Sequence, residues 1–346
     1  MSFLSNVISF LIYFFSAALS VFFIKRAEKK KKRKLSAALG VLIPSVVAAF
    51  RESGIDLATY RSWYDFIHAG GKYDVELGWN ILNKIAPSFA ALQFLAAFIF
   101  FFVSYLAIKK FDAPNRWLSW LIILSLSTGM LYNMTRQAIA VAFIFLGTAY
   151  FSKKKYFKFL ISVLFATLFH KTAIIMSLLL PLYWFIMKRV KKLILVTAIM
   201  SAASILCVPM IVWAVRRLGL FSTYMLDKSF ELSLSFLLYT LPPLLLYAWK
   251  PSVFKEDKRV RFCLVLYLFI IPMQFLGMRL PFADRIMFYF RPAIAIAVPL
   301  MIARYAEIDK SKAKWIKAGY VLWFIFYHIM MGFLLNENGM YPYINF

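Results

Sequence analysis

The sequence predicts an all-α, polytopic integral membrane protein with about 12 transmembrane helices and both termini on the non-cytoplasmic side. Three observations lead to this fold class. Hydrophobic residues make up 63% of the 346 positions and charged residues only 16%, whereas about 25% charged residues is usual in soluble domains. Apolar runs close to the length of a membrane span recur along the chain. Basic residues gather in short clusters between these runs, which is typical of membrane proteins.

The apolar runs define the expected helices one by one, because a span needs roughly 20 apolar residues. The first run is followed by the basic residues 25–34, which reverses the charge order of a secretory signal. We therefore expect a retained first helix whose N-terminus lies outside the cytoplasm. The predicted helices cover residues 3–24, 35–50, 86–108, 117–132, 134–151, 156–169, 172–187, 193–214, 234–249, 262–277, 286–303 and 318–335.

The basic residues predict the orientation of these helices. Six short loops on one side carry 29 of the 41 basic residues, so the two faces differ, at about +23 and +3. The lysine-rich face is expected to be cytoplasmic. The net charge of +26 does not indicate nucleic-acid binding, because it is spread over these loops. The assigned loops are 25–34, 109–116, 152–155 with Lys158, 188–192, 250–261 and 304–317.

The chain is expected to form a single transmembrane domain, residues 1–346, without a soluble domain. Its larger outer loops are residues 51–87 and 216–233. Cys207 and Cys263 both lie inside apolar runs, so neither a disulfide nor a metal site is expected.

A short hairpin is expected between two basic clusters. Only 32 residues separate Lys155 from Lys188, and both flanks must lie on the cytoplasmic face. Two spans of about 16 residues are each roughly 24 Å long, which is short of a hydrocarbon core of about 30 Å. The tip of the hairpin, residues 169–172, is therefore predicted to lie below the outer membrane surface.

Cationic and titratable side chains gather near the predicted outer face. An arginine within a membrane is costly unless it pairs or faces water, and arginine suits bidentate binding of phosphate. The interpretation is an anionic head group, with a diphosphate fitting best; the alternative for any one arginine is snorkelling at a helix end. Pro292 predicts a kink beside Arg291. The residues concerned are Arg51, Arg136, His170, Arg279, Arg285 and Arg291.

The outer loop 51–87 combines carboxylates with aromatic rings, which is typical of sugar sites. The alternative is an interfacial aromatic belt with solvated acids. Removal of a proton from a sugar hydroxyl needs a base. His170, with an ordinary pKa near 6.5, and the carboxylates of Asp56 and Glu76 are the candidates, and the sequence does not rank them.

Several segments resemble a known family in their order and spacing. Residues 133–140 read Asn-Met-Thr-Arg-Gln-Ala-Ile-Ala, residues 169–173 read Phe-His-Lys-Thr-Ala, and residues 51–60 read Arg-Glu-Ser-Gly-Ile-Asp-Leu-Ala-Thr-Tyr. Glu76-Leu77-Gly78 and Asp284-Arg285-Ile286 continue the pattern. Over residues 40–300 or so the chain resembles the EpsG group of Wzy-like polysaccharide polymerases, and more broadly GT-C-like membrane glycosyltransferases without a soluble domain.

The resemblance implies polymerisation of undecaprenyl-diphosphate-linked oligosaccharide repeat units into exopolysaccharide or capsule. The reaction is expected at the outer face of the bacterial cytoplasmic membrane, with no cofactor, no metal and no nucleic acid. The expected partners are the lipid-linked oligosaccharide, membrane lipids, and a chain-length regulator and flippase of the same pathway. Three alternatives stay open: a flippase or transporter of lipid-linked oligosaccharide, an O-antigen-ligase-like or acyl transferase, and a scaffold protein.

The roles that follow are of three kinds. The base is expected among His170, Asp56 and Glu76. The diphosphate is expected on Arg136, Arg285 and Arg291, with Arg51 and Arg279 as second choices. The residues expected to contact sugar are Tyr60, Tyr64, Asp65, Gln137 and Tyr289.

Overall fold

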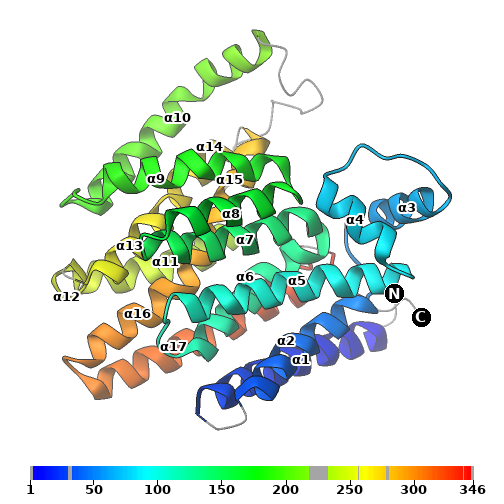
Figure 1. The fold of residues 1–346 in the computed structure, drawn as a ribbon. Helices are drawn as coiled ribbons and strands as arrows, with labels where there is room; N and C mark the ends of the chain where they lie inside the picture. Colours follow the sequence, from blue (N-terminus) through cyan, green and yellow to red (C-terminus); the bar gives the residue numbers. More distant parts are fainter. Residues whose placement is uncertain are drawn as a thin grey trace. The chain divides into compact units, whose positions relative to one another are not determined.

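The computed structural model describes residues 3–29, 33–217, 233–255, 257–277, 280–337 and 339–343. All regular secondary structure in these ranges is helical, as predicted (Figure 1). The chain divides into two compact units, Met1–Ile174 with Ala306–Phe346, and Ile175–Tyr305. The expected outer loop 216–233 lies almost entirely outside the described residues. The single transmembrane domain stays a prediction.

The first unit is a bundle in which each long helix packs on its neighbours. α2 packs on α1 and α5, α5 packs on α7, and α7 packs on α8; α6 packs on α1, α7 and α17. The described helices of this unit are α1 (Phe3–Lys29), α2 (Arg33–Ala49), α3 (Leu57–His68), α4 (Leu77–Ile85), α5 (Phe89–Lys110), α6 (Arg116–Asn133), α7 (Thr135–Ser152), α8 (Tyr156–Thr167), the 3-10 turn η1 (Lys171–Ile175), α17 (Lys310–His328) and the π-helical η3 (Ile329–Leu334).

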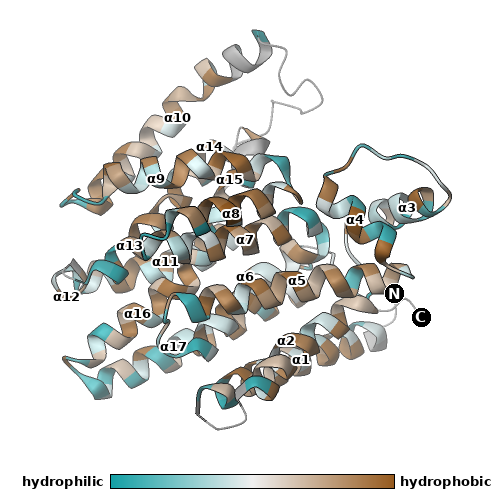
Figure 2. Ribbon diagram, in the orientation of Figure 1, coloured by the Kyte–Doolittle hydropathy of each residue, from teal (hydrophilic) through white to brown (hydrophobic). Residues whose placement is uncertain are grey.

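One end of this bundle is rich in lysine. The Glu28 carboxylate at the end of α1 accepts a hydrogen bond from the backbone N–H of Trp117, 3.0 Å away, at the start of α6. Lys153 pairs with Asp112 at the same end. Figure 2 shows apolar residues along the helices and hydrophilic residues towards their ends. This end therefore joins the basic loops that the sequence places on one face.

At the opposite end, segments from both ends of the chain meet. The Tyr343 backbone N–H donates to Ser9 Oγ in α1 at 2.7 Å, and the Tyr343 carbonyl accepts from the Glu52 N–H at 2.8 Å. The Ser53 hydroxyl donates to the Met340 carbonyl at 2.7 Å. Residues near the two termini thus share one end of the unit, and the side of the membrane on which they lie stays a prediction.

The segment expected as an outer loop, residues 51–87, contains two helices, α3 and α4. The buried face of α3 repeats at helical spacing and carries Leu57, Tyr60, Tyr64 and Ile67. The Tyr64 hydroxyl donates to the Ala86 carbonyl at 3.0 Å, which ties α3 to the end of α4. Gly54 has φ +139° in the turn before α3, a conformation that favours glycine. Loop 51–87 is therefore a folded cap over this end of the bundle.

The second unit has two proline-containing breaks in its longest apolar segments. α13 ends at Leu268, four residues before Pro272, and a proline both lacks the N–H and clashes with the carbonyl four residues back. The predicted kink at Pro292 is confirmed, because the 3-10 turn η2 separates α15 from α16. The described helices are α9 (Met176–Met187), α10 (Leu193–Arg217), α11 (Leu234–Trp249), α12 (Pro251–Lys255), α13 (Lys258–Leu268), α14 (Ile270–Gly277), α15 (Pro281–Phe290), η2 (Arg291–Ala293) and α16 (Ile294–Ala306).

Each of the twelve predicted ranges contains a helix, and the chain has the helices of a membrane protein. In the described part of the chain, six helices are long and apolar enough to cross a membrane, and four apolar helices are shorter. α8 and α9 have 12 residues each, about 18 Å, so the hairpin is short, as expected. The number of spans stays a prediction. The six long spans are Ser5–Glu28, Phe89–Lys110, Leu193–Ile211, Lys258–Gly277, Arg285–Ala306 and Lys310–Leu334.

The chemical difference between the two ends of the first unit can be tested by labelling single cysteines. In a background with Cys207 and Cys263 replaced by alanine, Thr59→Cys in the exposed face of α3 should react with a membrane-impermeant maleimide in intact cells. Lys155→Cys and Ser311→Cys, both exposed at the lysine-rich end, should react only after permeabilisation. Labelling of all three in intact cells would contradict the predicted orientation.

Candidate active site

A buried carboxylate lies at the centre of the polar cluster in the first unit. Glu76 is the N-cap residue of α4, and its side chain is only 8% exposed. One carboxylate oxygen pairs with Arg136 Nη1. The other accepts from the Lys171 backbone N–H at 3.3 Å and lies 3.6 Å from His170 Nδ1. Three segments far apart in the sequence therefore converge on one side chain.

Local backbone structure places each member of the cluster. Arg136 lies in the first turn of α7, directly after α6 ends, and His170 lies in the turn between α8 and η1. The Gly78 backbone N–H donates to the Leu168 carbonyl at 2.7 Å, which holds the first turn of α4 against the end of α8. A Cβ atom at Gly78 would lie 2.8 Å from that carbonyl oxygen. Only glycine allows this approach without a shift of the backbone.

Glu76 remains ionised at neutral pH. Burial is the largest single influence and acts to raise the pKa of Glu76, but interaction with His170 and the charge of Arg136 outweigh it together. The pKa of Glu76 falls from 4.5 to about 2. His170 Nδ1 is just beyond hydrogen-bond distance of the carboxylate, and neither ring nitrogen has a hydrogen-bond partner among the described residues.

Aromatic rings surround the guanidinium of Arg136. Its Cζ lies 4.8 Å from the ring centroid of Trp63, and Trp63 lies 5.0 Å from Tyr73. Tyr60 packs against both Trp63 and Trp79, at 5.5 Å and 5.2 Å. Tyr73 is 42% exposed, whereas Tyr60 and Trp79 are buried. The cluster therefore has a buried aromatic support and an exposed aromatic rim.

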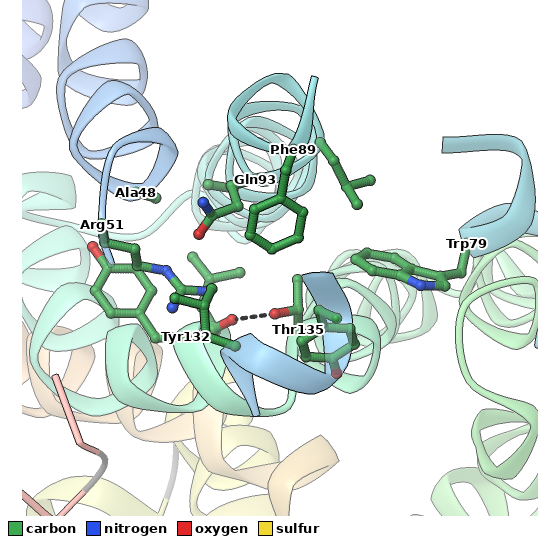
Figure 3. A pocket seen from close by; sticks show the side chains of 12 residues that line it. Ala48, Arg51, Trp79, Phe89, Gln93, Tyr132 and Thr135 are labelled. Atoms are coloured by element: carbon green, nitrogen blue, oxygen red, sulfur yellow. Dashed lines mark hydrogen bonds between the residues drawn. The ribbon is translucent and has the colours of Figure 1, made fainter. Parts of the chain in front are cut away.

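Arg51 lines a small cavity of about 10 Å³ together with Trp79, Phe89 and Tyr132 (Figure 3). The cavity has space for about one water molecule. Arg51 is buried, donates from Nη1 to the Ser53 carbonyl at 2.6 Å and stacks on Tyr132 at 4.5 Å. Gln93 and Thr135 also line the cavity, but the Thr135 hydroxyl already donates to the carbonyl of Leu131, four residues earlier, at 2.8 Å. Arg51 is thus enclosed by the cap rather than open to a large ligand.

The structure brings together some of the predicted site residues and separates others. Glu76, Arg136 and His170 form the cluster, and Tyr60 adjoins it. Burial, the largest influence, raises the pKa of Tyr60, while the charge of Arg136 opposes the shift and that of Asp56 adds to it.

Three further predicted residues lie outside this contact. Gln137 follows Arg136 and is buried. Tyr64 is also buried, with its hydroxyl bonded to the Ala86 carbonyl, and Asp65 lies on the exposed face of α3.

The remaining predicted residues belong to the second unit. Arg285 and Tyr289 lie one turn apart on α15. Arg291 is buried in η2, with its guanidinium 4.4 Å from the ring centroid of Tyr239. Arg279 lies outside the described residues. The roles of these residues stay predictions.

The sequence places Trp63 and Trp79 among the aromatic rings of loop 51–87 and Gly78 in the family resemblance, but it gives none of the three a role of its own in the cluster. The signal for Trp63 was present, since it follows Tyr60 by three residues on an amphipathic helix whose apolar positions repeat at helical spacing. No sequence signal identifies the contact of Gly78 with Leu168, because it joins segments 90 residues apart. Among the described residues, no group of three or more His, Cys, Asp and Glu side chains could hold a metal ion.

Comparison with known proteins gives one match. A family model described as EpsG family matches residues 34–345, nearly the whole chain. No curated protein and no solved structure matches.

The ion pair between Glu76 and Arg136 should contribute measurably to the free energy of unfolding. Glu76→Gln should destabilise the protein by about 2 kcal/mol, because it leaves a charged hydrogen-bonding partner unsatisfied. Because the pKa of Glu76 is lowered from 4.5 to about 2, its stabilising effect is complete above about pH 4.5 and is lost as the pH falls towards 2. The difference in Tm between wild type and variant, measured by thermal unfolding in detergent, should therefore shrink as the pH falls from about 4.5 towards 2. Asp74→Asn is the matched control, since Asp74 is 98% exposed; an equal effect of both variants would contradict the assignment.

The contact between α4 and α8 should tolerate no side chain at Gly78. Gly78→Ala should lower the free energy of unfolding by about 1–3 kcal/mol, as is usual for overpacking. Gly319→Ala is the control, because a Cβ there meets nothing within 4 Å and alanine favours a helix by up to about 1 kcal/mol. Thermal unfolding of the two variants side by side gives the comparison. A Gly78→Ala protein as stable as Gly319→Ala would show that the close approach is not needed.

Proposed function

Because this chain belongs to the EpsG family, a family of Wzy-like polysaccharide polymerases, we propose that it joins lipid-linked oligosaccharide repeat units into exopolysaccharide or capsule. The donor in this proposal is an oligosaccharide on undecaprenyl diphosphate. The reaction is a glycosyl transfer at the outer face of the bacterial cytoplasmic membrane. The observation that carries the proposal is the cluster of Glu76, Arg136 and His170, because it combines a base with a cation beside aromatic rings.

His170 is the proposed general base. Its Nδ1 faces the ionised carboxylate of Glu76, which leaves Nε2 to accept the proton of an acceptor hydroxyl. Glu76 then orients the imidazole and stabilises the imidazolium that forms, as the aspartate of a catalytic triad does. A carboxylate with a pKa of about 2 is a poor base near neutral pH. Glu76 is therefore assigned the positioning role, and Asp56 the lower rank as a base.

The transfer step forms one bond, breaks one bond and transfers one proton. The acceptor oxygen forms a bond to C1 of the donor sugar, and the bond from C1 to the diphosphate oxygen breaks. The electron pair leaves with the lipid diphosphate, and the hydroxyl proton goes to His170 Nε2. A fixed cation beside the departing oxygen stabilises the charge that develops there.

Arg136 is the proposed cation for this leaving group. Its side chain is 22% exposed, and its Nε has no hydrogen-bond partner in the described part of the chain. The fork of a guanidinium can keep one contact with Glu76 and offer further N–H groups to a phosphate. Arg51 is enclosed and already bonded to Ser53, so it suits this role less well. Arg285 and Arg291 remain candidates from the second unit, and so does Arg279.

The sugar is proposed to lie against the aromatic rim. Trp63 lies beside Arg136, the exposed ring of Tyr73 lies beside Trp63, and such rings stack on the apolar faces of pyranoses. The buried ring of Tyr60 packs against Trp63 of this rim. Tyr64 and Asp65 are less suited, since the first is occupied in packing and the second lies on the exposed face of α3. Gln137 and Tyr289 keep their proposed sugar contacts.

The proposal can be tested with purified protein and a lipid-diphosphate oligosaccharide. The wild type should produce a ladder of longer lipid-linked glycans. His170→Gln and Arg136→Ala should each lower the rate at least 100-fold, since removal of a general base or of a charge-stabilising group costs about this much. His68→Gln should stay within twofold of the wild type, because His68 only packs on Tyr64 and bonds to its carbonyl.

Two results would overturn the proposal in different ways. Unchanged ladders in both His170→Gln and Arg136→Ala would remove the site assignment. Movement of the lipid-linked oligosaccharide across a vesicle membrane without any chain growth would replace the polymerase by a transporter.

A further inference from the structure

A groove of about 310 Å³ opens on the first unit, and its lining contains none of the residues of the Glu76 cluster. Its floor is α6, and its walls are α1 and α17, because both helices pack on α6. Each helix contributes residues at helical spacing, so one face of each lines the groove. Phe14 and Val21 come from α1, Leu121 from α6, and Val321 and Ile325 from α17. The lining is almost wholly apolar.

The groove has the length of one membrane leaflet. It extends along α1 from Phe14 to Lys25, a rise of about 16 Å over 11 residues. Half of a hydrocarbon core of about 30 Å is close to this value. Phe14 and His328 lie at the inner end, and Lys25 and Trp117 lie at the lysine-rich end of the unit. An extended acyl chain that starts at that surface would fill such a groove.

The mouth of the groove is cationic. Lys25 is exposed, and its Nζ lies 5.0 Å from the ring centroid of Trp117. Glu28 bonds to the Trp117 backbone and so fixes this indole beside the lysine. Lys317 lies four residues before Val321, hence on the same face of α17. Arg26 and Arg116 add further positive charge nearby, which exceeds the single charge of Glu28.

We propose that this groove binds an anionic phospholipid, with one acyl chain between α1 and α17 and its phosphate group between Lys25 and Lys317. The acyl chain requires an apolar wall along its length. The phosphate group of the lipid requires cations at the depth of the membrane interface. Trp117 lines the mouth of the groove, and tryptophan rings are enriched at the head-group level of membranes. The site is separate from glycosyl transfer and stands whether or not that activity is correct.

Native mass spectrometry of the purified full chain provides the test. The probes are phosphatidylglycerol and phosphatidylcholine with the same acyl chains. The first phosphatidylglycerol adduct should form at a concentration at least fivefold lower than the phosphatidylcholine adduct. The double variant Lys25→Gln/Lys317→Gln should weaken it by about 25-fold, since each basic residue near an anionic lipid contributes about fivefold.

Two matched controls separate the groove from general attraction. Lys155→Gln/Lys158→Gln removes the same charge from the same end of the unit, at α8, and should leave the adduct unchanged. Val321→Trp fills the groove with its cations intact and should weaken the adduct at least fivefold. Leu322→Trp places the same bulk on a residue that is exposed outside the groove and should have no effect.

Three outcomes would overturn the inference. Equal weakening by both lysine pairs would show a diffuse surface attraction. Unchanged binding in Val321→Trp would exclude the groove as the site of the chain. Equal affinity for the two lipids would remove the anionic selection, as expected if the groove instead receives the transmembrane helix of a partner protein.

Discussion

The ion pair and close contacts of Glu76 are the constraint around which the site of the first unit is organised. A carboxylate that is 8% exposed is costly unless it is paired, and Arg136 and the Lys171 backbone satisfy it. To reach them, α4 must pack its first turn against the end of α8, which requires Gly78. The position of His170, the exposure of Arg136 and the stacking of Trp63 all follow from this arrangement.

The two ends of the first unit differ in their charged residues. Lysines lie where the sequence places the cytoplasmic loops, and their partners there are exposed or interfacial, as with Lys153 and Asp112. Glu76, Arg136 and His170 lie together at the other end, where α3 and α4 cover the bundle. The groove between α1, α6 and α17 and the Glu76 cluster thus lie towards opposite ends of the same unit.

The sequence predicted some residues of the site and not others, for physical reasons that differ. Arg136 and His170 were identifiable because ionisable residues beside apolar runs are rare and costly. Tyr60, Tyr64 and Asp65 were assigned from composition alone, although only their positions on α3 decide which ring is buried in packing and which carboxylate is exposed. The roles of Trp63 and Trp79 depend on the same helix geometry. Arg51 was assigned to the diphosphate by charge, yet the cap encloses it.

By itself, the sequence determined the helices, the break at Pro292 and the charge difference between the loops, because hydropathy, proline stereochemistry and charge are properties of short segments. Only the tertiary structure decided that Glu76 joins Arg136, 60 residues away, and Lys171, 95 residues away. No local property encodes such a meeting. It arises because a buried carboxylate must find its partners in whichever segments the packing of α4, α7 and α8 brings within reach.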